Sequence, residues 1–180
     1  MEARRHFDVV GLELAPQAAD HARSAGLSVL QGEPDEERLR EIGKVDVIVM
    51  LDVIEHLLNP RQTLALCGRH LSPGGIVVIT TGDFGSLLAR FAGKHWRLMT
   101  PPQHLWFFTR EGMRRLSAEA GLCMTRFDRP WKIVPASLAL FQLQRVLHVR
   151  TPRLAAASRV GIPINLFDAM RVMIEKPGNG

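Results

Sequence analysis

The stretch from Val45 to Asp83 constrains the fold of this chain more than any other. It holds two apolar runs rich in β-branched residues, 45–51 and 76–81, separated by a segment with helical periodicity. This order predicts two parallel strands joined by a helix, which is the unit of an α/β fold. Because both runs are apolar on both faces, we expect helices on both sides of the sheet, in a three-layer structure.

The joining segment carries clear helix boundaries. Asn59 and Pro60 are typical of a helix start, since asparagine caps a free backbone N–H and proline suits the first turn. The run 72–75, which reads SPGG, predicts the helix end and the turn into the next strand. Ligands of open parallel sheets bind beyond the carboxyl ends of the strands. This rule predicts a functional rim that contains Asp52, Glu55, His56 and Asp83.

Length and composition favour a single domain, here 1–180, with a sizeable core. The net charge of +5 comes from scattered basic residues, so no nucleic-acid partner is expected. The longest apolar helical stretch, 136–149, is interrupted by polar residues and is too short to span a bilayer. Cys67 and Cys123 have neither disulfide nor metal-ligand spacing, which together with the lack of a signal-peptide pattern favours a cytoplasmic location.

Two short motifs carry a family resemblance. Residues 52–57 read DVIEHL and residues 71–75 read LSPGG, with Asn59-Pro60 between them. This combination resembles the fourth strand, the following helix and the fifth strand of class I S-adenosylmethionine-dependent methyltransferases. The resemblance extends over residues 7–177 and implies a Rossmann-like, mostly parallel sheet with a terminal antiparallel strand. It also implies S-adenosylmethionine (SAM) as the cofactor and a small molecule as the methyl acceptor.

The expected cofactor contacts lie at the ends of strands. A strand over 7–14 contains Glu13, whose carboxylate suits the two ribose hydroxyls of a nucleotide, although it could also simply face solvent. The resemblance implies that Glu33 lies near the adenine, and a solvated turn is the alternative. The residues predicted to bind the cofactor are Glu13, Leu14, Glu33, Leu51 and Asp52.

One part of the family pattern has no counterpart here. These methyltransferases begin with a strand that leads into a G-x-G-x-G turn, and residues 1–6 supply neither. In the family the absent strand lies between the strands that here cover 7–14 and 45–51, so two strand edges would lack a ladder partner. We therefore expect a domain that is truncated at its N-terminus or degenerate. Alone, it should be marginally stable, bind SAM poorly and show little activity.

The acceptor side contains two candidate catalytic bases. Methyl transfer from a sulfonium requires positioning, and it requires a base only where the acceptor must lose a proton. His56 belongs to the DVIEHL motif, and His104 lies in an aromatic loop that resembles the P-x-x-H-L-x-x-F-T stretch over the family's active site. Imidazole titrates near neutrality and suits this task. For each histidine, a purely structural hydrogen bond is the alternative.

Other groups near the rim have weaker assignments. The carboxylates of Asp52, Glu55 and Asp83 are further options for a base. Trp96, Trp106 and Phe107 could line an apolar acceptor pocket or belong to the core. No metal site is predicted, because the histidines lack the spacing of a ligand set.

The region 129–165 is predicted to be a helical insertion or lid. Its helix over 136–150 has an apolar stripe that fits core packing, a lid or a homodimer contact. Two further functions stay open on the sequence. One is a non-catalytic interaction module with a methyltransferase-like fold, and the other is a nicotinamide-dependent Rossmann enzyme.

Overall fold

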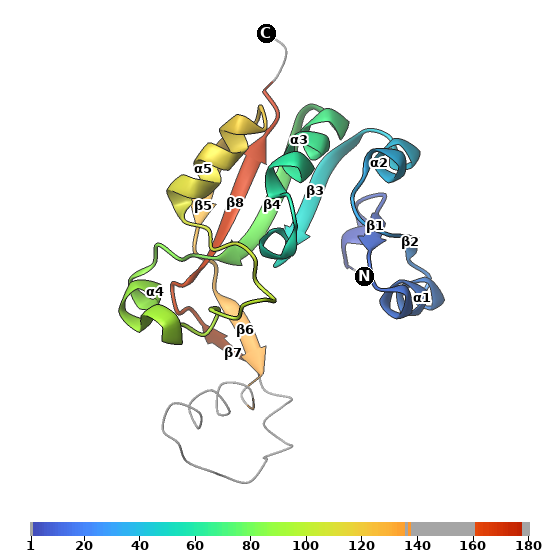
Figure 1. Cartoon of the computed structure of the whole chain (residues 1–180). Coiled ribbons are helices and arrows are strands. Elements are labelled where there is room, and N and C mark those ends of the chain that lie inside the picture. The colour runs from blue at the N-terminus through green and yellow to red at the C-terminus, as the bar shows by residue number, and fades with distance from the viewer. Residues whose placement is uncertain (1, 136, 138–160, 178–180) are drawn as a thin grey trace.

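The computed structural model describes residues 2–135, 137 and 161–177 of the chain. Its central feature is a four-stranded sheet with the strand order β3-β4-β8-β5 (Figure 1). The strands span β3 (Val45–Leu51), β4 (Leu71–Gly82), β5 (Cys123–Asp128) and β8 (Ala169–Glu175). β3 and β4 are parallel, whereas β8 is antiparallel to both β4 and β5. Only β8 therefore runs against the other three strands, and the predicted mostly parallel sheet with a terminal antiparallel strand is confirmed.

Two capped helices pack on this sheet. In α3 (Pro60–His70), the Asn59 side chain accepts a hydrogen bond from the backbone N–H of Gln62. In α5 (Arg110–Glu119), the Thr109 hydroxyl accepts one from the N–H of Gly112. Such caps satisfy backbone donors that the first helical turn leaves free. The start of α3 lies where the sequence predicted it.

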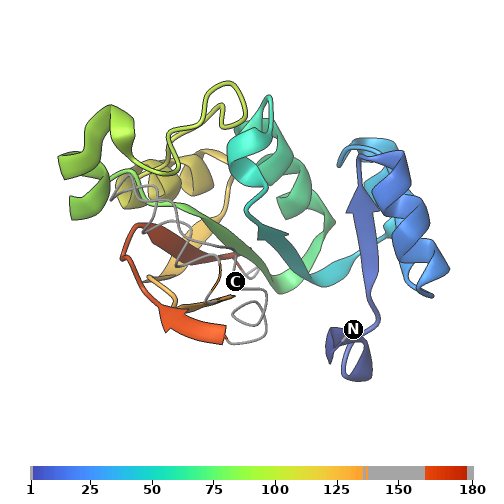
Figure 2. The same ribbon diagram turned by 90° about the horizontal axis from the view of Figure 1, so that it is seen from below.

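The core lies between the sheet and these two helices. Figure 2 shows α3 and α5 on the same face of the sheet. The fully buried side chains of this core include those of Leu64, Val77, Ile79, Met113, Met170, Val172 and Ile174. On the opposite face of β3, Val47, Val49 and Leu51 are 42%, 56% and 60% exposed. The described residues thus cover one face of this sheet well, whereas the sequence predicted cover on both.

The N-terminal part of the chain contains a second, smaller sheet of two strands, β1 (Val10–Glu13) and β2 (Ser28–Gln31). Its helices are the 3-10 helix η1 (Glu2–Arg5), α1 (Pro16–Ser24) and α2 (Glu36–Ile42). β1 and β2 are parallel and, among the strands that the structure describes, pair only with each other. Glu36 of α2 forms ion pairs with Arg69 at 2.8 Å and His70 at 3.6 Å at the end of α3. β1 and β3 belong to different sheets, so they are not hydrogen-bonded to each other, as the sequence predicted. Among the described residues, no strand lies between them and pairs with both.

The remaining elements correct the prediction for the C-terminal third. The short helices are η2 (Ile54–His56), α4 (Leu87–Ala92) and η3 (Gly93–His95). β6 (Lys132–Pro135) and β7 (Gly161–Ile164) form an antiparallel pair. The sequence predicted a helix that starts at Pro135 and a loop or short helix over 151–163. Both predictions are wrong for Pro135 and for residues 161–163, which belong to strands that pair with each other across a long stretch of sequence.

The predicted helix over 136–150 lies outside the described residues, apart from Ser137. Its roles as a core helix, a lid or a homodimer contact therefore stay predictions, as does the boundary of the 129–165 insertion. In the part of the chain that the structure describes, no helix has both the length and the apolar character needed to cross a membrane.

The first turn of α5 leads to a prediction on pH. The Glu111 carboxylate accepts hydrogen bonds from Arg114 at 2.7 and 2.8 Å and from Arg115 at 2.9 Å, and these bonds lower its pKa from 4.5 to about 2. A carboxyl group with a lowered pKa stabilises the fold above its unfolded value, and this contribution is lost as the pH falls through the folded value. NMR of the Glu111 carboxyl carbon should therefore give a titration midpoint near pH 2 instead of 4.5. The double variant Arg114→Gln, Arg115→Gln should titrate near 4.5, and an equal midpoint in both proteins would contradict the assignment.

Candidate functional site

The carboxyl end of β3 is the centre of the candidate site. Asp52 follows β3 directly and has a backbone φ of 53°, in the left-handed region that non-glycine residues rarely adopt. Its N–H donates to the carbonyl oxygen of Thr80 at 2.9 Å, and the Thr80 hydroxyl donates to Asp52 Oδ1 at 3.1 Å. Asp52 is exposed and held at the ends of the two parallel strands β3 and β4, as the rim prediction requires.

The short helix η2 carries the next two polar residues of the motif. Ile54 is fully buried and anchors the turn, and Glu55 is only 4% exposed. The Glu55 carbonyl oxygen accepts hydrogen bonds from the N–H groups of Leu105 at 2.9 Å and Trp106 at 3.2 Å. The aromatic loop is therefore fixed directly against the DVIEHL motif.

The fold brings Glu55, His56 and His104 together, and we refer to them as the carboxylate–histidine cluster. The two imidazole rings lie 4.8 Å apart between centroids, with 69° between their planes. His56 Nδ1 is 2.6 Å from the carbonyl oxygen of Gln103, and His104 Nδ1 is 2.8 Å from that of Leu98. A carbonyl oxygen only accepts hydrogen bonds, so each Nδ1 carries a proton, and in the neutral form of each ring Nε2 keeps its lone pair. The two predicted bases thus lie side by side. Each also makes, through Nδ1, the kind of structural hydrogen bond to the backbone that the sequence left open as an alternative role.

The residues predicted to bind the cofactor fall into two groups. Leu51 and Asp52 lie beside the carboxylate–histidine cluster in sequence and at the end of β3. Glu13 and Leu14 lie at the end of β1, where Glu13 Oε1 accepts from the N–H of Ala15 at 2.9 Å. Glu33 is exposed in the turn after β2. The Glu13 carbonyl accepts from the N–H of Gly32 at 2.9 Å, so the ends of β1 and β2 are joined, but this group belongs to the smaller sheet.

Asp83, which the sequence placed among the options for a base, has a structural role instead. Its side chain is 1% exposed and accepts hydrogen bonds from Arg129 Nη2 at 2.6 Å and Nε at 3.0 Å. A second buried carboxylate, Asp168, accepts from Trp96 Nε1 at 3.0 Å and from two nitrogens of Arg97 at 2.9 Å. Trp96 is 3% exposed and belongs to the core. Sequence reasoning missed Asp168, since no local pattern links it to a loop so far away in the chain.

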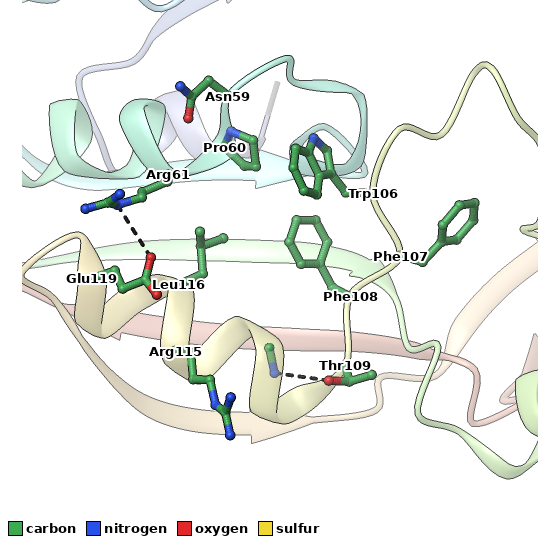
Figure 3. Close-up of a pocket in the computed structure, with 11 residues that line it drawn as sticks. Asn59, Pro60, Arg61, Trp106, Phe107, Phe108, Thr109, Arg115, Leu116 and Glu119 are labelled. Atoms are coloured by element: carbon green, nitrogen blue, oxygen red, sulfur yellow. Dashed lines mark hydrogen bonds and ion pairs between the residues drawn. The ribbon is translucent and has the colours of Figure 1, made fainter.

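A groove of about 480 Å³ lies between α3 and α5. In Figure 3, Trp106 and Phe108 lie beside Pro60, whereas Phe107 points away from them. The Trp106 indole N–H donates to the carbonyl oxygen of Leu57 at 2.8 Å. The Phe107 ring lies 6.4 Å from the ring of His104. Trp106, Phe107 and Phe108 all line the groove, and Phe107 also lies near His104 of the cluster.

Comparison with known proteins gives a family and several relatives. The family described as "Methyltransferase domain" matches residues 1–126. A ubiquinone biosynthesis O-methyltransferase of Cereibacter sphaeroides is 32% identical over 131 residues, which are 67% of this chain and 53% of that protein. The protein of the same name from Roseobacter denitrificans is 30% identical over 131 residues, with the same coverage. The chain thus spans about half the length of the curated relatives it matches.

Solved structures agree on the fold. A SAM-dependent methyltransferase from Thermotoga maritima is 20% identical, with a TM-score of 0.58 over 93% of this chain and 72% of that one. The magnesium protoporphyrin IX methyltransferase from Synechocystis, solved with bound SAH, is 11% identical, with a TM-score of 0.56 over 97% of this chain and 66% of that one. At these identities the likeness concerns the fold alone.

Proposed function

Because the chain belongs to the methyltransferase domain family, we propose that it takes part in SAM-dependent methyl transfer to an oxygen atom of a small-molecule acceptor. The observation that carries this proposal is the position of Asp52, Glu55 and His56 at the end of β3, beneath a loop that contributes His104. Oxygen is proposed as the acceptor atom because the relatives from two genera are O-methyltransferases by name.

The cofactor is proposed to contact the ends of β1 and β3. Glu13 would accept hydrogen bonds from the ribose hydroxyls, because a carboxylate at the end of an early strand suits two neighbouring donors. Leu14, Glu33, Leu51 and Asp52 would complete the contacts. Since β1 and β3 belong to separate sheets, we expect the two halves of this cleft to be joined only loosely and SAM to bind weakly.

The chemistry asks little of the side chains. When bound, SAM would supply a methyl group activated by its sulfonium, and the acceptor oxygen would take that methyl in place of sulfur, leaving S-adenosylhomocysteine. The acceptor hydroxyl must lose its proton, and the Nε2 lone pairs of His56 and His104 are the proposed acceptors of that proton. Phe107, beside His104, would contribute to an apolar wall for the acceptor.

One observation favours a second candidate, a non-catalytic interaction module. The exposed side chains of Val47, Val49 and Leu51 form an apolar strip on β3 that suits a partner surface. The nicotinamide-dependent alternative loses its support, since the family match is to methyltransferases.

Binding of SAM to the full chain tests the proposal. Saturation-transfer NMR should give saturable binding in the upper micromolar range or weaker, with NADH failing to compete. Glu13→Gln should weaken it about tenfold or more, because hydrogen bonds to a charged group contribute about 1.5 to 3 kcal/mol each. Glu41→Gln, an exposed position on α2, is the matched control and should bind SAM as the unaltered chain does. Absence of SAM binding would favour the interaction module, and equal affinity in Glu13→Gln would remove the ribose assignment.

A further inference from the structure

The Glu55 carboxylate has an unsatisfied oxygen inside the protein. Its Oε2 atom is buried and has no hydrogen-bond partner among the described residues. Glu55 as a whole is 4% exposed, so solvent does not compensate for the missing partner. A buried carboxylate is costly unless it is paired, hydrogen-bonded or bound to a metal. An ionised Glu55 would therefore need a further partner at Oε2, and the described residues do not supply one.

The two neighbouring histidines present complementary atoms. Because the Nδ1–H groups of His56 and His104 donate to backbone carbonyls, their orientation and tautomer are fixed. Metal-binding histidines nearly always use one ring nitrogen in this way and coordinate through the other. The hydrogen bonds from His56 and His104 Nδ1 to backbone carbonyl oxygens thus match the arrangement expected around a bound cation.

We propose that the carboxylate–histidine cluster binds a first-row divalent transition metal ion of the Zn²⁺ type. One ligand atom from each of its three residues lies within 4.8 Å of the other two. A tetrahedral zinc ion with bonds of about 2.0 to 2.2 Å holds its ligand atoms roughly 3.4 Å apart. The ligand atoms would therefore have to approach one another by up to about 1.4 Å when the ion binds. Imidazole ligands suit Zn²⁺, Fe²⁺ and Co²⁺, whereas Mg²⁺ prefers oxygen ligands only.

The spacing of the histidines along the chain had argued against a metal site. His56 and His104 are too distant in sequence to resemble a ligand motif, and the sequence predicted no metal site. The hydrogen bonds from Leu105 and Trp106 to the Glu55 carbonyl bring the loop onto η2 and assemble the three groups. Three protein ligands leave a coordination position open, as in catalytic zinc sites. If the proposed function holds, an acceptor oxygen would occupy that position and lose its proton to solvent more easily there, because Nε2 of His56 and His104 would then hold the ion instead of accepting the proton.

Metal binding by the full chain is the test, and it needs neither SAM nor an acceptor. The metal-free protein is titrated with Zn²⁺ against a chromophoric chelator, and Co²⁺ is added separately to record its visible absorption. We expect one high-affinity ion per chain that millimolar Mg²⁺ does not displace. Glu55→Gln and His104→Gln should each weaken Zn²⁺ binding about 100-fold or more, beyond the 10- to 100-fold typical of losing an outer-shell partner.

Two controls separate this site from other sources of binding. His95→Gln removes an exposed histidine of the same loop region and should leave the affinity unchanged. Cys123→Ser removes the exposed thiol, whereas burial raises the pKa of the Cys67 thiol to about 12 and disfavours its thiolate. Circular dichroism of each variant without metal verifies that it folds.

Several outcomes would overturn the proposal. They are an absence of Zn²⁺ binding, equal binding in Glu55→Gln and His104→Gln, or a loss of binding in Cys123→Ser alone. Absence of binding would mean that a proton shared between Glu55 and a histidine balances the buried charge. Since SAM binding is measured separately, failure of the metal site would leave the proposed methyl transfer standing, and failure of SAM binding would leave the metal site standing.

Discussion

Replacing Asp168 by asparagine is expected to lower the free energy of unfolding by about 3 kcal/mol, since removal of one member of a buried ion pair typically costs about 3 to 5 kcal/mol. The carboxylate is 1% exposed and accepts hydrogen bonds from Trp96 and Arg97. Its loss would leave the Arg97 guanidinium partly buried without its counter-charge and release the loop from the start of β8. Urea denaturation at pH 7 measures the effect as a lower midpoint at an unchanged slope.

The matched control for this charge change is Asp20→Asn. Asp20 forms an ion pair with Arg23 at 3.0 Å, and its side chain is 73% exposed. Exposed pairs contribute about 0 to 1 kcal/mol, so the midpoint should barely move. A similar loss in both variants would contradict the view that the Asp168 network fastens the loop to the sheet.

Ile79→Ala is expected to lower the free energy of unfolding by about 3 kcal/mol, within the range of about 2 to 5 kcal/mol for large-to-small changes in a core. Ile79 is fully buried on the face of β4 that α3 and α5 cover, opposite Met50 of β3 and Val172 of β8. Alanine there would leave a cavity that these neighbours cannot fill. The same urea experiment measures the loss.

Ile76→Ala is the internal comparison, because it makes the same chemical change on the same strand. Ile76 lies on the other face of β4 and is partly exposed. We expect a loss of about 1 kcal/mol, in line with the smaller apolar area that the mutation removes from contact. Equal losses at positions 76 and 79 would mean that both faces of the sheet are buried to the same degree.

Local signals in the sequence were sufficient for much of the fold. Asn59 caps the helix that it was predicted to cap, and the strand over 45–51 has its predicted bounds. These features depend on neighbours within a few residues. By contrast, β4 begins at Leu71 and contains the SPGG run, which was predicted as a turn. Leu71 pairs with Val45 across the sheet, and the register shifts between this pair and the pair Val47–Ile76. Strand pairing of this kind cannot be derived from the local pattern.

The candidate site was predicted in part for the same reason. The rim position of Asp52, Glu55 and His56 follows from the strand that precedes them. The sequence could name His104 only as a member of an aromatic loop. Its contact with His56 depends on hydrogen bonds from that loop to the Glu55 carbonyl. The isolated Oε2 atom of Glu55 also required the structure, since burial of one oxygen depends on every element around it.

The left-handed backbone at Asp52 limits which replacements this position can accept. Glycine takes up such a conformation freely, whereas an L-residue there costs roughly 1 to 2 kcal/mol. A change to glycine would thus ease the turn while deleting the carboxylate, and a change to valine or isoleucine would strain it further. The backbone conformation after β3 does not itself require an acidic side chain. If Asp52→Gly folds but loses ligand binding, the carboxylate is needed at this position for binding and not for the fold.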